Sequence, residues 1–335
     1  MIVEAGPFFP NNAMRSSNPM VSVVIPTRNR PALLLRAVRS ALKQTLREIE
    51  VIVVIDGEPG WESADAVACL NEPRLRCIAL REQAGGAEAR NIGVRTARAA
   101  WIALLDDDDE WLPSKLEMQM DATRPHEGKP LLVVTCQHIH RAEGAADVVR
   151  PRRLPRLGEP PSEFMFDYLC YFQTSTFMCS KELMLTFPFT KDLPFFQDID
   201  WFLRALSGLD VQLIVVAQPL SIYYAPEKRE TITSCLYWKS RLDWGRANRH
   251  LMSKRGYSRF IVGSCVGPAA QDRAGVRGFS RLFYECAIVG SPTPQLLLLL
   301  FGTYLLRPTL RKKLRDRFLL RRANIQAISE QNSVS

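Results

Sequence analysis

The feature that most constrains the fold is a series of short apolar runs, each followed by a turn and then by residues at helical spacing. Residues 21–25 are mostly β-branched and are closed by Pro26, and residues 50–55 and 101–105 are similar runs. Residues 31–44 place leucine, valine and alanine at the spacing of an amphipathic helix. Continuous apolar strands that alternate with helices are typical of a parallel sheet covered on both sides. The sequence therefore predicts an α/β fold with its polar sites at the carboxyl ends of the strands.

The same pattern sets the expected organisation of the chain. Its 335 residues suffice for one large domain and an appendage. We expect a flexible leader over residues 1–19, an α/β domain over residues 20–235, and a helical region over residues 236–335 that ends in an apolar and basic tail. Met20 is an alternative start of the chain. Further strands are predicted at residues 75–80, 131–136 and 211–216, and further helices at residues 64–70, 87–99 and 198–206.

Charge and cysteine content argue against several classes of protein. The formal net charge is +9, but much of the excess lies near the C-terminus, and no nucleic-acid partner is expected. The eight cysteines are scattered without a C-x-x-C pair, and the four histidines show neither a catalytic triad nor zinc spacing. We expect reduced, mostly buried thiols. The N-terminus lacks the basic start and apolar stretch of a secretory signal, which indicates the cytoplasm.

Five consecutive acids, residues 106–110, follow the apolar run at residues 101–105. Like charges at the end of a buried strand repel one another unless a cation compensates them. Mg²⁺ or Mn²⁺ binds one or two carboxylates and completes its shell with water and phosphate oxygens, which suits a diphosphate-bearing ligand. The alternative is the N-terminus of a helix beginning at Trp111, because acids stabilise that end. Five acids exceed what a helix end needs, so composition favours metal binding.

Four segments resemble, in order, the successive motifs of the family 2 glycosyltransferases, which have the GT-A fold. These segments are residues 21–31, 50–57, 85–93 and 103–113, and a weaker motif follows near Asp198. The close resemblance covers roughly residues 20–120. It implies a GT-A (Rossmann-like) fold, with a mostly parallel twisted sheet and helices on both faces, to which a helical C-terminal extension is added. It also implies transfer of a sugar, with inversion, from a nucleotide-diphosphate sugar, with UDP as the favoured nucleotide, to an acceptor hydroxyl.

The resemblance assigns the acidic run to the donor and the metal. Asp106 and Asp108 match the two acids of the family's D-x-D motif. It makes Asp108 the expected ligand of Mn²⁺ or Mg²⁺, with Asp106 beside it, and Asp107 a further donor contact. Asp198 matches the catalytic base, although the acid that usually precedes the base is here Gln197. Asp200 is the alternative base, and two acids in the first turn of a helix are the structural alternative.

The resemblance also supplies the remaining donor-binding candidates. They are Pro26, Thr27 and Asn29 after the first strand, Asp56 after the second, Arg90 within residues 85–93, and Lys228 with Arg229 in a later basic loop. Asn29 could instead cap the following helix, and Asp56 could be an ordinary turn residue. Arg90 could contact phosphate, brace the acidic run or face solvent. Arg28 stands where the family has an aromatic residue.

The C-terminal tail leaves two interpretations open. Residues 295–306 are strongly apolar but fall short of the ~20 residues that span a bilayer, and residues 307–322 are rich in lysine and arginine. Such a tail could lie on an anionic membrane surface or could pack on the domain or on a second subunit. The first interpretation suits a lipid-linked glycan as acceptor, besides a free carbohydrate, at the cytoplasmic face of the membrane. Either acceptor implies polysaccharide or glycoconjugate biosynthesis.

Three other functions compete with glycosyl transfer. A sugar-nucleotide pyrophosphorylase usually has a Gly-rich phosphate loop where this chain has residues 26–30. A NAD-dependent oxidoreductase would need G-x-G-x-x-G after the first strand, and none is present there. A nucleotide-sugar-binding or glycan-binding protein that has lost turnover is the third. The retained acids of the D-x-D motif and Asp198 argue against it, whereas Arg28 and Gln197 leave it open.

Overall fold

The computed structural model describes residues 18–57, 61–126, 128, 131–167, 170–208, 210–225 and 238–306. The chain divides into two compact units, with boundaries after Met165 and Ser234, and the short segment Phe166–Tyr168 belongs to the second unit. Lys228 and Arg229, the leader and the basic end of the tail lie outside the described residues. Unit 1 contains the sheet, and unit 2 is helical.

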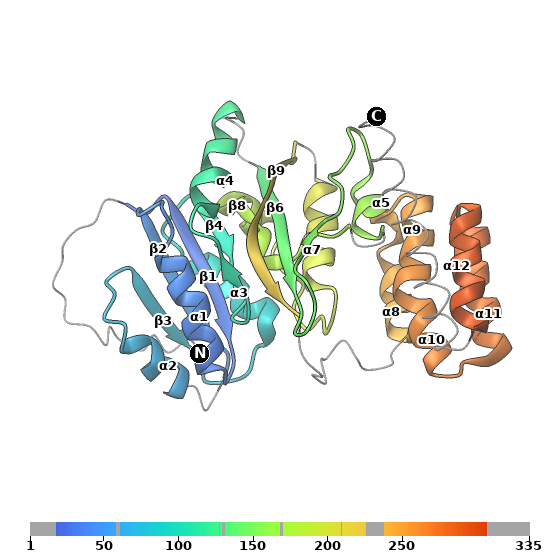
Figure 1. Ribbon diagram of the computed structural model, residues 1–335, viewed down its shortest axis with the longest axis horizontal. Coiled ribbons are helices and arrows are strands. Elements are labelled where there is room, and N and C mark those ends of the chain that lie inside the picture. Colours follow the sequence, from blue (N-terminus) through green and yellow to red (C-terminus); the bar gives the residue numbers. More distant parts are fainter. Residues whose placement is uncertain are drawn as a thin grey trace, which may run out of the picture. The chain divides into compact units, whose positions relative to one another are not determined.

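Within the described residues of unit 1, nine strands form one sheet (Figure 1). The order is β3-β2-β1-β4-β8-β6-β9-β5, and β7 pairs with β6 off this path. The strands are β1 (Val21–Thr27), β2 (Ile49–Ile55), β3 (Leu75–Ala79), β4 (Trp101–Leu104), β5 (Glu110–Trp111), β6 (Leu132–Arg141), β7 (Val148–Arg150), β8 (Met178–Ser180) and β9 (Gln212–Tyr224).

The sheet has a parallel half and a mixed half. The strands β3, β2, β1 and β4 are all parallel, which confirms the prediction drawn from their apolar runs. Beyond them, β8 runs antiparallel to both β4 and β6, β6 is parallel to β9, and β5 is antiparallel to β9. The turns that follow β1, β2 and β4 therefore open at one edge of the parallel half.

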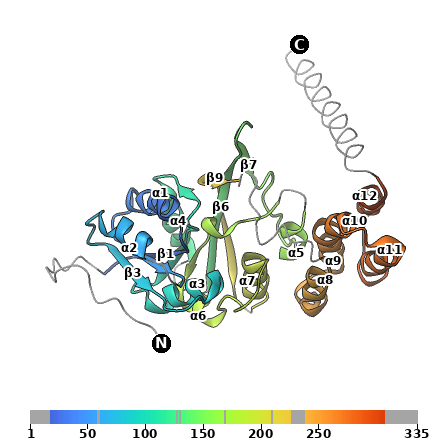
Figure 2. The same ribbon diagram turned by 90° about the horizontal axis from the view of Figure 1, so that it is seen from below.

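Helices cover both faces of this sheet, as expected (Figures 1 and 2). Along β1, Val23 and Ile25 belong to one hydrophobic core and Val24 to the other, because successive side chains of a strand point to opposite faces. The helices of the first core are α1 (Pro31–Leu42), α2 (Trp61–Ala68) and α4 (Lys115–Thr123), and those of the second are α3 (Gly85–Thr96), α5 (Pro161–Met165), α6 (Lys181–Thr186) and α7 (Gln197–Leu206). A Cβ at Gly93 of α3 would lie 2.3 Å from Cγ1 of Val24, so only glycine allows this helix its close approach to β1.

Three local predictions need correction. Trp111 does not begin a helix, because Glu110–Trp111 pairs with β9 and the helix α4 starts at Lys115. Asn29 does not cap α1: the N-cap residue is Arg30, no side-chain cap bond is present, and Asn29 has φ 52°. The strands β6 and β9 extend well beyond the predicted residues 131–136 and 211–216. Their second halves, which contain polar residues, continue the pairing of the two strands.

Unit 2 is a small helical body. Its α-helices are α8 (Trp238–Ala247), α9 (Lys254–Phe260), α10 (Gly267–Gln271), α11 (Gly275–Tyr284) and α12 (Pro294–Leu305). The buried Glu285 accepts a hydrogen bond from the Tyr257 hydroxyl at 2.7 Å and pairs with Arg246. The rings of Phe279 and Phe301 join α11 to α12, with centroids 5.4 Å apart. Among the helices that the structure describes, none has the length and apolar character needed to cross a bilayer.

Candidate active site

The acidic run forms a turn directly after β4, and its side chains point to different partners. Arg90 on α3 binds the carboxylate of Asp106 at 2.5 Å. Asp107 accepts a hydrogen bond from the Thr27 hydroxyl at 2.7 Å, and Asp109 accepts one from Ser175 at 2.5 Å. We call residues 106–109 the acid turn. These partners offset part of the repulsion among the like charges of the acid turn.

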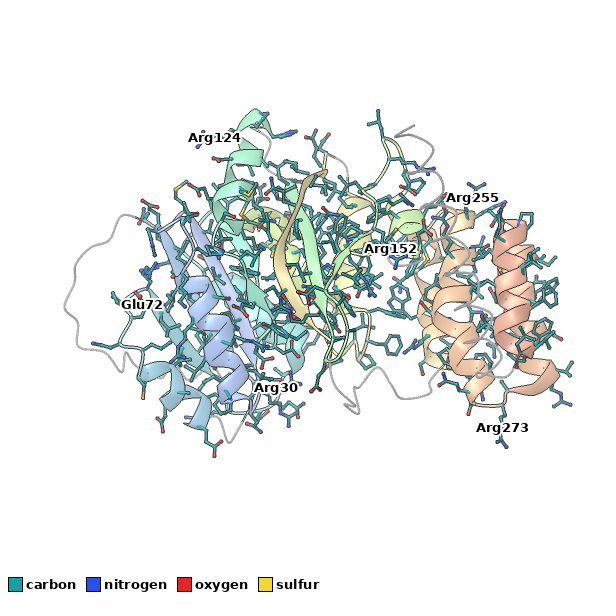
Figure 3. The ribbon with its side chains drawn as sticks, viewed as in Figure 1. Arg30, Glu72, Arg124, Arg152, Arg255 and Arg273 are labelled. Carbon is teal, nitrogen blue, oxygen red and sulfur yellow. The ribbon has the colours of Figure 1, made fainter. Side chains whose placement is uncertain are left out.

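Arg30 is a cation of this site that the sequence did not single out. Its Nη1 lies 3.1 Å from Asp107 Oδ1 and 3.2 Å from Asp108 Oδ2, and it sits at the start of α1, where Figure 3 labels it. Burial raises the pKa of Asp107 to about 6, although the hydrogen bond from Thr27 and the charge of Arg30 act to lower it. The guanidinium thus partly compensates two carboxylates at once.

Ser175 fixes both ends of the acid turn. Its hydroxyl accepts a hydrogen bond from the backbone N–H of Asp106 at 3.0 Å while it donates to Asp109. The indole N–H of Trp111 donates to the carbonyl of Ser175 at 2.7 Å and holds the serine in place. Burial raises the pKa of Asp109 well above its usual value, and the charges of Asp106 and Asp108 raise it further.

Arg90 connects the acid turn to the candidate base. Besides Asp106 it donates to Oε1 of Gln197 at 3.0 Å, and Gln197 precedes Asp198 in the first turn of α7. Arg90 is only 9% exposed, so the solvent-facing alternative is wrong. Burial raises the pKa of Asp198; the charge of Asp106 acts in the same direction and that of Arg90 opposes it. A carboxylate with a raised pKa is a better proton acceptor near neutral pH.

Asp200, the alternative base, has a structural role. It is 3% exposed, accepts the Thr190 hydroxyl at 2.6 Å and pairs with Arg204 one turn along α7 at 2.9 Å. These partners tie α7 to the segment before it and turn the Asp200 carboxylate away from bulk solvent. Asp198 lies in electrostatic reach of Asp106 in the acid turn.

The remaining candidates lie around the end of β1 and β2. Pro26 pairs with Val54 inside the sheet, and Asn29 is exposed. The carboxylate of Asp56 accepts backbone N–H groups of Ala84 at 2.6 Å and Gly85 at 3.1 Å, so it holds the start of α3. Asp56 therefore has a structural role of its own, in a turn where Gly57 has φ +82°.

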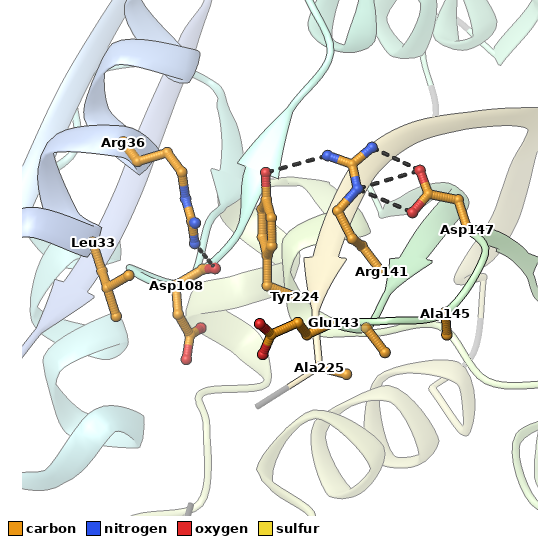
Figure 4. A pocket seen from close by; sticks show the side chains of 10 residues that line it. Leu33, Arg36, Asp108, Arg141, Glu143, Ala145, Asp147, Tyr224 and Ala225 are labelled. Atoms are coloured by element: carbon orange, nitrogen blue, oxygen red, sulfur yellow. Dashed lines mark hydrogen bonds and ion pairs between the residues drawn. The ribbon is translucent and has the colours of Figure 1, made fainter. Parts of the chain in front are cut away.

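A pocket of about 620 Å³ opens beside Asp108 (Figure 4). The guanidinium of Arg36 lies 3.8 Å from the ring centroid of Tyr224 and donates to the carbonyl of Asp108 at 2.5 Å. Arg141, on the other side of Tyr224 in Figure 4, pairs with Asp147 at 2.7 Å. Small-molecule sites commonly have volumes in this range. The other lining residues are Leu33, Ala142, Glu143, Ala145 and Ala225.

The acid turn has the chemistry of a divalent-cation site that is completed by a ligand. Within the described residues, no three His, Cys, Asp or Glu side chains form a ready-made metal cluster. Mg²⁺ or Mn²⁺ bound together with phosphates needs only one or two carboxylates. The side chains of Asp106 and Asp108 are 27% and 30% exposed, whereas Asp109 is buried. Asp106 and Asp108 therefore fit a hard cation whose other ligands are phosphate oxygens and water.

Comparisons with curated proteins find relatives in bacterial polysaccharide biosynthesis. The chain is 37% identical over 103 residues to the putative colanic acid biosynthesis glycosyl transferase WcaA of Escherichia coli, covering 30% of this chain and 37% of that protein. It is 25% identical over 247 residues to the amylovoran biosynthesis glycosyltransferase AmsB of Erwinia amylovora, covering 70% and 82%. It is 40% identical over 107 residues to the succinoglycan biosynthesis protein ExoO of Rhizobium meliloti, covering 31% and 29%. The chain therefore matches only about a third of the length of two of these relatives.

Solved structures agree on the fold. The chain is similar to TarS of S. aureus, residues 1–349, in complex with UDP-GlcNAc, with a TM-score of 0.53 and 17% identity over 84% of this chain and 79% of that one. A second TarS structure gives a TM-score of 0.51 with 16% identity, over 80% and 52%. These likenesses confirm the expected GT-A fold. Residues 22–186 match the family model described as glycosyl transferase family 2, and through this domain the chain belongs to that family.

Proposed function

We propose that the protein transfers a sugar, with inversion, from a nucleotide-diphosphate sugar to a hydroxyl group of a glycan acceptor. The observation that carries this proposal is the bridge made by Arg90. One guanidinium binds Asp106 of the acid turn and Gln197, the neighbour of Asp198. Arg90 thereby links Asp106, a proposed donor-binding acid, to the helix turn that carries Asp198, whose pKa is raised. A leaving-group site and a proton acceptor are what a direct displacement requires.

The donor is assigned to the edge of the sheet beside Asp108. The pocket there is large enough for a small ligand, and Arg36 and Arg30 bring positive charge to it. The nucleoside of the donor would bind beside the turns that follow β1 and β2, near Thr27 and Asp56. UDP is the favoured nucleotide, which agrees with the UDP-GlcNAc bound in the TarS structure.

Asp108, with Asp106 beside it, would hold Mn²⁺ or Mg²⁺. A divalent cation supplies Lewis-acid stabilisation of the negative charge on a departing diphosphate. Arg30 bridges Asp107 and Asp108, and Arg90 pairs with Asp106, so the acid turn is already shaped before a ligand arrives. Such preorganisation reduces the free energy needed to assemble the site.

Asp198 would accept the proton of the acceptor hydroxyl. Its carboxyl lies at the N-terminal end of α7, where Oδ1 accepts the N–H of Ile199 at 2.9 Å. That contact fixes the orientation of the carboxyl group, which is only partly buried and can therefore meet an acceptor. Gln197 holds Arg90 where the family usually has a second acid, so less negative charge surrounds the base than in other members.

The names of the relatives suggest polysaccharide biosynthesis as the wider role, with a carbohydrate or a lipid-linked glycan as acceptor. A further part of the proposal is attachment to the anionic inner face of the membrane through the C-terminal region. In unit 2 several large apolar side chains are exposed: Val276, Tyr284, Ile288, Leu298, Leu299, Phe301 and Leu305. Arginines lie in the same unit, among them Arg255 and Arg273, which Figure 3 labels. Apolar area next to basic charge is typical of interfacial binding.

The first experiment is a thermal-shift screen of the purified chain with nucleotide sugars and Mn²⁺, because a ligand of the native state raises its apparent stability. The nucleotide sugar that gives the largest thermal shift is then used as donor in assays of sugar transfer to an acceptor. Asp198→Asn should lower kcat by about 10² to 10⁴ and keep the donor-induced shift. Asp108→Ala should lose the Mn²⁺-dependent part of that shift, whereas Asp121→Asn, on the exposed side of α4, should resemble wild type.

Each competing function predicts a different result. Wild-type turnover in Asp198→Asn would sink the assignment of the base. Formation of a nucleotide sugar from a nucleoside triphosphate and a sugar 1-phosphate, with release of pyrophosphate, would identify a pyrophosphorylase. Donor binding without turnover on any acceptor or on water would identify a binding protein. For the membrane part, a chain ending near Pro294 should release from anionic liposomes and keep donor hydrolysis, and unchanged liposome binding would contradict it.

A further inference from the structure

Two histidines and two tyrosines gather near the candidate base. His138 and His140 lie on β6, Tyr223 lies on β9, and Tyr171 lies in the segment before β8. The imidazole of His140 stacks on Tyr223 with ring centroids 5.2 Å apart and an interplanar angle of 22°. The ring centroid of His138 lies 5.7 Å from that of Tyr171 and 6.1 Å from that of Tyr223. We call these four side chains the aromatic platform.

The aromatic platform adjoins the acid turn and Asp198. Tyr171 lies in electrostatic reach of both Asp198 and Asp109, whose negative charges add to the effect of burial in raising the pKa of its phenol. Tyr223 lies in reach of Tyr171 and Asp109. The next residue of β9, Tyr224, lines the pocket beside Asp108 instead. Because successive residues of a strand point to opposite sides, β9 supplies one tyrosine to each of two places around the acid turn.

Buried polar atoms without partners surround the platform. Among the described residues, both ring nitrogens of His138 and Nδ1 of His140 have no hydrogen-bond partner. Two further buried atoms in this part of the chain also have no hydrogen-bond partner: Nε2 of Gln173 and Oγ of Ser221. Ser221 is the residue of β9 that pairs with His138 of β6. Native proteins rarely leave such atoms unpaired, because each costs free energy unless water or a ligand satisfies it. Burial lowers the pKa of His138 to about 3, so its neutral imidazole offers one donor and one acceptor.

This combination of groups matches the chemistry of a sugar ring. His140, Tyr171 and Tyr223 are each partly exposed, so their rings offer an apolar surface to a ligand. A pyranose has an apolar C–H face, and hydroxyl groups around it that both donate and accept hydrogen bonds. The platform provides ring faces for the first. The unpaired atoms of His138 and Ser221 have no exposed surface, so they lie behind this surface and do not themselves reach a ligand.

We propose that the aromatic platform binds the sugar ring of the acceptor glycan and selects which sugar receives the transferred residue. This inference rests on the proposed function, since it places the acceptor ring where one hydroxyl can reach Asp198. In this arrangement the rings of His140 and Tyr223 carry the sugar ring, and the buried His138 packs against Tyr171 and Tyr223 and holds them in place. The platform is a specificity-determining surface that takes no part in donor binding.

The test separates transfer to water from transfer to a sugar. Release of nucleoside diphosphate from the donor is measured without acceptor and with a panel of methyl glycosides of hexoses, N-acetylhexosamines and uronic acids. His140→Ala and Tyr223→Leu should each raise the KM for an active glycoside about tenfold. Donor hydrolysis should change by less than about twofold. The matched control His250→Ala, at an exposed position of unit 2, should behave like wild type.

A second measurement does not depend on turnover. Saturation-transfer NMR with the same glycosides should show contact from protein aromatic protons to the C–H face of the sugar in wild type, and its loss in Tyr223→Leu. Unchanged KM and unchanged saturation transfer in the platform variants, with donor hydrolysis intact, would overturn the platform alone. So would the absence of transfer and saturation for every glycoside while donor hydrolysis proceeds. Absence of donor binding and hydrolysis in wild type would instead refute the proposed function.

Discussion

A buried lysine behind the acid turn gives a prediction that can be worked out quantitatively. Lys115, the first residue of α4, has no exposed surface; its ammonium donates to Oε1 of Gln119 at 2.7 Å and lies 4.1 Å from the ring centroid of Trp111. Burial lowers its pKa from 10.5 to about 8, although nearby Cys136 and Cys179 act to raise it. The folded protein therefore binds this proton less tightly than the unfolded chain does.

The sign of the effect on stability follows from linkage. Below a pH of about 8 the lysine is charged in both states, and its contribution to the free energy of unfolding is at its lowest. As pH rises from about 8 towards 10.5, the folded state releases the proton first, and stability from this group increases. A pKa difference of about 2.5 corresponds to about 3 kcal/mol, of which about 2 kcal/mol is gained between a pH of about 7 and about 9.5.

Lys115→Met keeps the volume of the side chain and removes the titrating group. We expect the difference in the free energy of unfolding between wild type and Lys115→Met to shift by about 2 kcal/mol in favour of wild type over that pH range. The assay is urea unfolding followed by tryptophan fluorescence at both pH values. The matched control is Lys239→Met, at an exposed position in unit 2, which should follow wild type at both. Parallel pH profiles for wild type and Lys115→Met would refute the reasoning.

Three further predictions concern packing and the support of the site. Gly93→Ala should destabilise the protein by about 1 to 3 kcal/mol in urea unfolding, since its Cβ would overlap Val24; a neutral effect would mean that α3 can move. Arg90→Lys should lower transfer about 10- to 100-fold, because an ammonium cannot make both guanidinium contacts, and a rate close to wild type would contradict the bridge. Ser175→Ala should weaken donor binding about tenfold in thermal-shift titrations, while an unchanged affinity would show that the acid turn holds its shape without this hydroxyl.

Much of the parallel half of the fold could be predicted because its signals are local. Each apolar run of β1, β2 and β4 is continuous, and each is followed by residues at helical spacing or by a turn. The acid turn was equally visible, because its carboxylates are consecutive in the sequence. Where several like charges adjoin a buried strand, electrostatic repulsion alone indicates that a compensating partner is needed.

The second half of the site depends on contacts between distant segments and could not be predicted in the same way. Arg30 reaches Asp107 across 77 residues of sequence, and Ser175 reaches Asp109 across 66. The spacing of the histidines of β6 matched no catalytic or metal-binding pattern. Their proposed role becomes visible only in the structure, where they contact Tyr223 of β9. Irregular register between Cys136 and His138 also interrupts the alternation of β6, so no simple periodicity indicates where its later side chains point. A useful signal was the run of aromatic and histidine residues in two strands that end near the acids.

The double contact of Ser175 has a consequence for protein engineering. The shape of the acid turn is specified jointly by residues 106–109 and by a serine in the short turn Thr174–Thr176, which precedes β8. Exchange of the acidic motif alone between members of the family would transplant its charges without the clamp that spaces them. A functional graft should therefore move residues 103–113 and 173–176 as one unit, with Trp111 included as the anchor of the serine.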